Sequence, residues 1–368
     1  MTEHYKELDG LRGLAAQVVL AAHANGLILA HPESLLGWLA RMAVIFFFVL
    51  SGFAIATTIK RHSLAAGGWD WSDYAIRRIA RIYPPYLVAV GSVAVISAFS
   101  LFGWTMLGMY RPAADFNTGP ISWLRTLLFL YTGNDAITVA DGPIWSLRLE
   151  VALYIMAGLI AAAWFTHGLK RYVLVGCLAS LTGLFCARLS FMTIAIVLFG
   201  FGAAAALTMP ALSKTSARWS AGAIVVALLL PIVLVGLRDD SPLSIAYQAA
   251  VGAPIALLLV LLARSKLAGR SWWTRVAIAS GSWSYTLYIM LSPILIGLRT
   301  LFGDADPSGE TPLRGVIMFA LYFVLTNFTC WVIALVVERP SYFARLIRKS
   351  IAPINAIPAA SAASVREE

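Results

Sequence analysis

Charged residues are scarce in this sequence: Asp, Glu, Lys and Arg together make up 12% of its 368 residues. That is about half of the share found in a typical soluble domain. Apolar residues reach 60%, and the mean hydropathy is +0.80. This small number of charged residues cannot cover the surface of a soluble protein of this length. Lipid must therefore contact much of the surface of this protein. The sequence therefore predicts an all-α, multi-pass membrane protein and excludes a soluble domain.

Cysteines are also few, and they give no sign of a metal site or a disulfide framework. Cys177, Cys186 and Cys330 lie in apolar stretches, and their spacing fits no zinc motif. We interpret them as buried small apolar residues, and we expect the protein to hold no metal. The N-terminal MTEHYKELDGLRG carries acids beside a lysine, so we expect no cleaved signal peptide.

The net charge of +10 raises the question of a nucleic-acid partner. Such a partner requires basic residues that gather on one solvated face. Here the basic residues stand between apolar runs instead. We therefore expect the lipid bilayer, and no nucleic acid, as a partner of this chain.

Ten apolar stretches can cross a bilayer, because a helical span needs about 20 residues. They are 11–30, 42–60, 83–103, 144–166, 172–187, 189–208, 219–237, 243–263, 276–301 and 313–337. A further apolar piece, 121–131, is short and contains Arg125, so we predict that it lies in the membrane interface. Ten spans with a cytoplasmic N-terminus place most Lys and Arg in cytoplasmic loops, as the positive-inside rule requires.

This count implies that both termini are cytoplasmic and that the chain has one membrane domain over residues 1–351. The remaining segment, 352–368, is rich in Ala, Pro and Ser, and we expect it to be disordered.

Ionisable residues inside spans are costly, so each of them is a candidate functional residue. His23 lies roughly 20 Å along the first helix from Gly10, past the midplane toward the outer face. A neutral histidine is tolerated there and can act as a general base near pH 7. The alternative interpretation is that His23 only forms a hydrogen bond to a neighbouring helix. Asn25 shares the span and predicts a polar interior face.

Three arginines stand at the expected cytoplasmic ends of spans. Arg12 begins the first span, while Arg78 and Arg81 in RRIARIYPPY are three residues apart and point the same way on a helix. Two guanidiniums at such a place can bind phosphate in a bidentate manner. The alternatives are interfacial anchoring, ordinary positive-inside charge and contacts with anionic lipid.

The segment WSLRLE at the outer start of the fourth span supplies Trp145, Ser146 and Glu150. Ser146 and Glu150 are four residues apart and share a helix face. Glu150 can hold a partner histidine or bind a sugar hydroxyl, or it is a paired charge at the interface. Ser51 and Gly52 lie in the second span, where small residues permit close helix contact.

Five segments occur in an order that resembles the acyltransferase-3 family of bacterial membrane O-acyltransferases, from Leu8 to about Arg339. They are LDGLRGLAA followed by His23, then FFFVLSGFAI, RRIARIYPPY, WSLRLE and SYTLYI at 284–289. The resemblance implies transfer of an acyl group, usually acetyl, from cytoplasmic acetyl-CoA or another acyl-CoA. It implies that the acceptor is a hydroxyl of an extracytoplasmic or lipid-linked glycan, and that the protein lies in the bacterial cytoplasmic membrane.

The family's motifs also imply roles for particular residues of this chain. His23 corresponds to the family's essential histidine in the first helix, and Glu150 corresponds to the acid after its W-S motif. The residues that correspond to the family's arginines, and that would bind the CoA phosphates, are Arg12, Arg78 and Arg81.

One position departs from the family. Many members carry a histidine shortly after the S-Y-x-L-Y motif, whereas this sequence has Leu291 and Ser292 there. The departure puts the chemistry of that second position in doubt or marks a subgroup.

We predict that His23 either deprotonates the acceptor hydroxyl or carries the acyl group as an acyl-imidazole. Glu150 or Asn25 would orient the acceptor. The residues that we predict to contact the acceptor are Asn25, Ser51, Trp145 and Ser146. Two other readings stay open at this point: a transporter or flippase without covalent chemistry, and an acyltransferase with a small-molecule acceptor.

Overall fold

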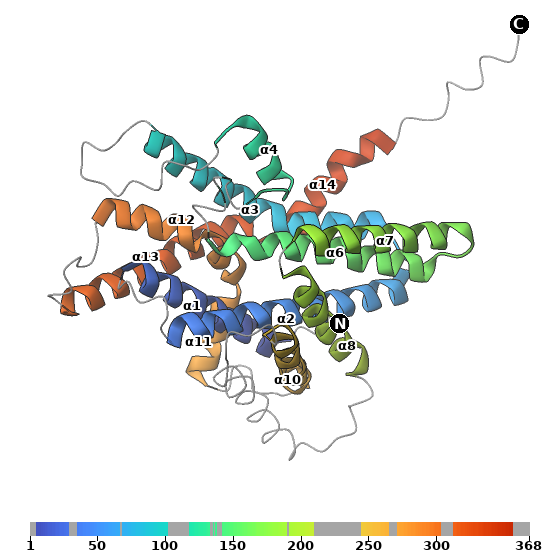
Figure 1. Cartoon of the computed structure of the whole chain (residues 1–368), viewed down its shortest axis with the longest axis horizontal. Coiled ribbons are helices and arrows are strands. Elements are labelled where there is room, and N and C mark those ends of the chain that lie inside the picture. The colour runs from blue at the N-terminus through green and yellow to red at the C-terminus, as the bar shows by residue number, and fades with distance from the viewer. Residues whose placement is uncertain are drawn as a thin grey trace, which may run out of the picture.

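A computed structural model describes residues 5–28, 35–66, 68–101, 118–132, 135, 137, 142–189, 191–209, 244–264, 271–302 and 312–355. These residues form helices and the turns between them, with no β-strand among them (Figure 1). The helices are α1 (Lys6–Ile28), α2 (Leu35–Ala66), α3 (Trp71–Leu101), α4 (Pro120–Leu127), η2 (Gly142–Ile144), α6 (Trp145–Phe165), α7 (Leu169–Arg188), α8 (Met192–Thr208), α10 (Ser244–Arg264), α11 (Trp272–Gly281), α12 (Ser284–Phe302), α13 (Pro312–Val337) and α14 (Pro340–Asn355). The predicted all-α class is therefore confirmed for the part of the chain that is described.

Several of these helices are long and apolar enough to cross a membrane. They are Leu35–Arg61, Trp71–Ala98, Gly142–Phe165, Leu169–Arg188 and Leu313–Ile351, to which the bent pair of α11 and α12 adds one more. Met192–Thr208 and Val251–Ala263 are apolar but shorter. The predicted span 219–237 and most of the tail 352–368 lie outside the described residues. The number of ten spans and the cytoplasmic location of both termini stay predictions.

Helix α1, which covers the predicted first span, is not among the helices that are apolar enough to cross alone. Its sequence carries polar and charged residues along much of its length. It packs against α2, α11, α12 and α13, as Figure 1 illustrates for α2 and α11. Ala16, Leu20 and Ala24 are fully buried there. The neighbouring helices therefore surround the polar residues of α1 and shield them from lipid.

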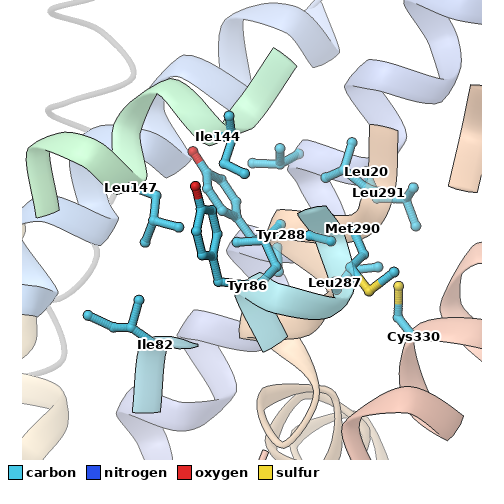
Figure 2. Close-up of a cluster of buried hydrophobic side chains, with 14 of the residues drawn as sticks. Leu20, Ile82, Tyr86, Ile144, Leu147, Leu287, Tyr288, Met290, Leu291 and Cys330 are labelled. Carbon is cyan, nitrogen blue, oxygen red and sulfur yellow. The ribbon is translucent and has the colours of Figure 1, made fainter. Parts of the chain in front are cut away.

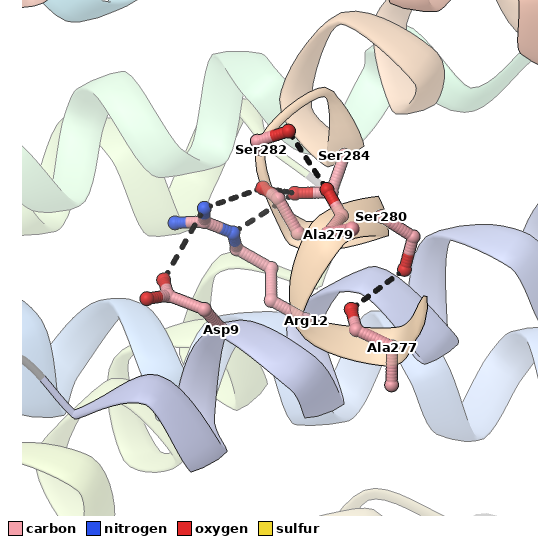
Figure 3. Close-up of polar contacts among 8 residues, drawn as sticks. Asp9, Arg12, Ala277, Ala279, Ser280, Ser282 and Ser284 are labelled. Carbon is pink, nitrogen blue, oxygen red and sulfur yellow. Dashed lines mark hydrogen bonds and ion pairs between the residues drawn. The ribbon is translucent and has the colours of Figure 1, made fainter. Parts of the chain in front are cut away.

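The predicted span 276–301 is not one continuous helix, although its two parts together are long and apolar enough to form one broken span. This segment forms α11 and α12, which meet at a bend of 72°. The cause is a close approach by α1: a Cβ atom at Gly281 would lie 2.4 Å from the carbonyl oxygen of Asp9. Arg12 then reaches the break, where it donates to the Gly281 carbonyl at 2.7 Å and to Ser284 Oγ at 2.9 Å (Figure 3). A carbonyl that the helix end leaves without a partner is thus satisfied inside the protein.

The small residues of the second span permit the close contact that the sequence predicts. A Cβ atom at Gly52 would lie 2.0 Å from the Phe199 carbonyl oxygen, and one at Gly202 would lie 1.8 Å from the Val49 carbonyl oxygen. Helices α2 and α8 therefore touch through their backbones. This contact fixes the position of α2 and of Ser51 beside Gly52.

Helix α4 lies within the predicted interfacial piece 121–131. Its eight residues extend about 12 Å, too short to cross a bilayer. Ile121, Leu124 and Leu127 are exposed, whereas Ser122 and Thr126 are buried. An apolar outer side on a short helix is what an interfacial position requires, and that position itself stays a prediction.

The expected burial of the cysteines is right for Cys330 and wrong for Cys177 and Cys186. The two exposed cysteines lie on α7, none of whose residues is buried. Helix α7 packs mainly on α6, so its apolar side chains face outward, as lipid contact demands.

The main core joins side chains of α1, α3, α6, α12 and α13 (Figure 2). Tyr86 is fully buried and stacks on Phe129 with ring centroids 4.3 Å apart. Leu291, one of the two residues at the position of the family's second histidine, lies in this core with no exposed surface. This packing fixes α12 as one wall of the cavities described next.

Candidate active site

One cavity of about 310 Å³ lies among α1, α2, α3, α6 and α12, and we call it the arginine cavity. Six of the nine predicted site residues line it, although they come from four helices. They are Arg12, Ser51, Arg78, Arg81, Ser146 and Glu150. The structure therefore brings the predicted phosphate-binding arginines and the predicted acid to one place.

Glu150 is held as a hydrogen-bond acceptor in this cavity. Ser51 Oγ donates to Glu150 Oε1 at 3.1 Å, and the Tyr154 hydroxyl donates to the same oxygen. The charges of Arg78 and Arg81 act on this carboxylate. Two hydroxyl donors and two neighbouring cations fix its place against the arginine pair.

Arg78 is partly buried, and its guanidinium has a buried N–H group that is free to donate a hydrogen bond. Its guanidinium lies 5.7 Å from the ring centroids of both Tyr74 and Tyr154. Its Nε has no hydrogen-bond partner among the described residues. A buried unpaired donor is costly, so a ligand that accepts from it would be favoured. Arg81 likewise forms no hydrogen bond or salt bridge within the described ranges, although its charge faces Glu150.

Arg12 differs from this pair because its guanidinium is already engaged. It donates to the break between α11 and α12, and it lies 3.4 Å from Asp9 Oδ1 (Figure 3). Its position on the cavity wall fits the predicted contact with the donor. Its existing bonds show that it also braces the bent helix pair, a role that no local sequence pattern indicates.

A second cavity, of about 510 Å³, contains His23, and we call it the histidine cavity. Its lining includes Arg41, Trp145 and Ser292. His23 Nδ1 lies 2.8 Å from the Val19 carbonyl oxygen. A carbonyl only accepts hydrogen bonds, so Nδ1 carries the proton and Nε2 is the basic nitrogen of the neutral ring.

The structure separates Glu150 from His23. The hydrogen bonds of Glu150 go to Ser51 and Tyr154, and that of His23 goes to its own helix. A direct pair of Glu150 with His23, one of the roles left open for Glu150, is therefore absent from the described residues. The reason is geometric: the two side chains line different cavities.

Tyr288 stands between the two cavities. Among the described residues it is the one that lines both. Its hydroxyl lies 2.7 Å from Ser146 Oγ and donates to the Pro143 carbonyl at 3.2 Å. Its ring meets Phe47 edge to face at 5.3 Å. Sequence reasoning missed Tyr288, although its place four residues after Ser284 in SYTLYI puts both on one helix face.

The remaining predicted residues divide between these places. Trp145 lines the histidine cavity, whereas Asn25 is buried and lines neither cavity. At the family's second histidine position, Ser292 lines the histidine cavity and Leu291 does not. Arg41, which the sequence did not single out as a site residue, lines the histidine cavity beside Trp145.

Comparison with known proteins points to one kind of chemistry. The sequence model of an acyltransferase domain family matches residues 5–335. The chain is 30% identical over 185 residues to "Protein 2 in picA locus" of Rhizobium radiobacter. The aligned segment covers 47% of this chain and 89% of that protein. It is 27% identical over 176 residues to the O-acetyl transferase of Shigella phage Sf6. This aligned segment covers 45% of the chain and 48% of the phage protein. No solved structure matches.

Proposed function

This chain belongs to the acyltransferase-3 family of membrane O-acyltransferases, and from that premise we propose that it transfers acetyl from cytoplasmic acetyl-CoA to a glycan hydroxyl. The acceptor is an extracytoplasmic glycan or its lipid-linked precursor, and the protein lies in the bacterial cytoplasmic membrane. The O-acetyl transferase of the phage is a relative that supports acetyl as the group transferred. The observation that carries the proposal is the pair of cavities that meet at Tyr288.

The arginine cavity suits the donor. Acetyl-CoA carries several phosphates, and guanidiniums bind phosphate through parallel charge-assisted hydrogen bonds. Arg78 and Arg81 have no hydrogen-bonded partner within the described residues, so phosphate oxygens would supply the missing acceptors. With the phosphates there, the thioester would reach inward along the cavity wall that carries Ser146 and Tyr288.

The histidine cavity suits the acceptor. Trp145 offers an aromatic surface on which a sugar ring can pack, and Arg41 and Ser292 offer polar contacts. His23 Nε2 takes the proton of the acceptor hydroxyl, and the oxygen forms a bond to the thioester carbonyl carbon. The C–S bond then breaks, and CoA leaves as a thiolate that receives a proton. The products are the O-acetyl ester and free CoA.

A two-step route through His23 is the alternative within the same proposal. In that route Nε2 attacks the thioester, CoA leaves, and the acceptor hydroxyl takes the acetyl group from the acyl-imidazole. Both routes need Nε2 free of a proton, which the Nδ1 bond to Val19 favours. Glu150 would act on the donor side in both, since it lies with Arg78 and Arg81.

The test is acetyl transfer by purified His23→Ala protein in membranes, measured as labelled acetate released from the glycan by mild base. We expect transfer to fall to background while the variant accumulates and inserts normally. His167→Ala is the matched control, because His167 lies in the connection between α6 and α7 and lines neither cavity. Normal acetylation by His23→Ala would overturn the proposed role of His23.

A further inference from the structure

A cleft of about 550 Å³ lies between the start of α3 and helix α14, and we call it the α14 cleft. Its wall is almost entirely basic or small: Arg77, Arg78, Arg81, Pro340, Ser341, Ala344, Arg345 and Arg348. Helix α14 begins at Pro340, beyond the region 5–335 that matches the family. The half of the cleft that α14 contributes therefore lies outside the residues that the family model matches.

The charges of the cleft are only partly balanced. Asp73 forms salt bridges with both Arg77 and Arg348, and the bond to Arg348 ties α14 to α3. Arg345 and Arg78 form no hydrogen bond or salt bridge with any residue that the structure describes. Glu150 acts on Arg78 and Arg81, and Glu338 acts on Arg81, although neither acid lines the cleft. The five guanidiniums still outnumber these three carboxylates, so the cleft has an excess of positive charge for an anion to neutralise.

The α14 cleft adjoins the arginine cavity. Arg78 and Arg81 line both spaces. A molecule that lies across these two side chains can therefore place an anionic end in the cleft and an uncharged arm in the arginine cavity. The arm then enters the cavity that Glu150 and Tyr288 also line.

Ordinary positive-inside charge or contact with anionic lipid explains basic residues at a membrane surface. It does not explain why Arg345 and Arg348 share one walled cleft with the partly buried Arg78. Lys349, on the same helix, lines no described cavity and is fully available to lipid. The arrangement fits a compact phosphate ligand held between two helices better than a diffuse charged surface.

We propose that α14 completes a phosphate site for the nucleotide end of the acyl-CoA, with Arg345 and Arg348 on its 3′-phosphate. This inference rests on the proposed donor. Arg78 and Arg81 lie where the cleft meets the arginine cavity and would hold the pyrophosphate. The 3′-phosphate is a monoester with several acceptor oxygens, for which the arginine fork is the matching group. The acyl-CoA would thus be anchored outside the arginine cavity and would present only its uncharged arm to the site.

The experiment compares the affinity of the full purified chain, in nanodiscs of neutral lipid, for CoA and for dephospho-CoA, which lacks the 3′-phosphate. We expect dephospho-CoA to bind about a hundredfold more weakly, the effect of losing two charge-assisted contacts of about tenfold each. In Arg345→Ala, CoA should weaken by about tenfold, while dephospho-CoA should bind as it does to the unaltered protein. The ratio of the two affinities should then fall about tenfold and stay above one, because Arg348 still contacts the 3′-phosphate.

Two variants sharpen this comparison. Lys349→Ala removes one positive charge from the same helix and should leave the ratio unchanged, which separates the site from the general field of α14. Arg345→Lys keeps the charge without the planar fork and should restore part of the ratio. Arg345 is a cleaner probe than Arg348, because Arg348 also ties α14 to Asp73.

The outcomes distinguish this inference from the proposed function. If Arg345→Ala binds both ligands as the unaltered protein does, or weakens both equally, the 3′-phosphate site on α14 is wrong and the donor stands. If the unaltered chain binds neither CoA nor dephospho-CoA, the proposed donor itself fails. If anionic nanodiscs abolish the effect of Arg345→Ala on CoA while lipid binding falls in that variant, the arginines bind lipid phosphate and the inference is overturned.

Discussion

We expect Gly52→Ala to destabilise the protein by about 1–3 kcal/mol, the usual cost of overpacking a close contact. The new Cβ atom would lie 2.0 Å from the carbonyl oxygen of Phe199, whereas ordinary contact begins at 3.4 Å. The obstacle is the backbone of α8, so no side-chain rotation can relieve it. The same interface is equally tight on its other side, where a Cβ atom at Gly202 would meet the Val49 carbonyl at 1.8 Å.

The two helices must therefore separate, and the separation reaches the site through α2. Ser51 precedes Gly52 and donates to Glu150 at 3.1 Å, near the upper limit of normal hydrogen-bond length. If α2 moves, this bond is lost and acetyl transfer should fall even where the protein remains folded. If α8 moves instead, stability should fall and transfer should be kept.

The assay is unfolding of the purified protein by a denaturing detergent, followed through the fluorescence of its 12 tryptophans. Gly200→Ala is the matched control, because a Cβ atom at Gly200, on the same helix as Gly202, meets nothing within 4 Å. That variant should be neutral or more stable by up to about 1 kcal/mol, since alanine favours helix over glycine. Equal unfolding midpoints for Gly52→Ala and Gly200→Ala would refute the reasoning.

Two further substitutions test the site. Tyr288→Ala opens the wall between the cavities and removes the hydroxyl that bonds to Ser146. This variant should transfer less acetyl and should hydrolyse more acetyl-CoA in the absence of acceptor, measured as free thiol. Unchanged hydrolysis would contradict a barrier at Tyr288. Arg12→Ala removes charge-assisted bonds to the break between α11 and α12. It should lower the free energy of unfolding by about 1.5–3 kcal/mol in the same assay. Weaker CoA binding at unchanged stability would show that Arg12 serves the ligand alone.

Much of the site could be predicted from local spacing. The pair of Arg78 and Arg81 and the pair of Ser146 and Glu150 each follow from helical periodicity, and all four side chains line one cavity. Depth along a helix is also predictable, because each residue advances it by about 1.5 Å. Local spacing therefore predicts shared helix faces. It also predicts that Glu150 lies at the outer end of its span and the two arginines at the cytoplasmic end, whereas all three side chains line one cavity.

What spacing does not give is the rotation of one helix relative to another. His23 and Glu150 are both placed toward the outer face by depth, yet they line different cavities. The helix break is hidden for a related reason. Average hydropathy over 276–301 is that of a span, and the break depends on Gly281 meeting the backbone of Asp9, far away in sequence. Contacts between distant backbones leave no local pattern to read.

Separation of Glu150 from His23 has a chemical advantage in an enzyme that takes donor and acceptor from opposite sides. A thioester beside a histidine and open water would be hydrolysed, so the two must meet only when the acceptor is present. Under the proposed function the phenol of Tyr288 would provide this barrier, and its hydroxyl bonds to Pro143 and Ser146, which stand on either side of Trp145 in the sequence. Trp145 lines the histidine cavity, which is the proposed acceptor site. A sugar that packs on Trp145 therefore presses on the same turn that holds Tyr288 in place, so acceptor binding and opening of the barrier act on one short segment of chain.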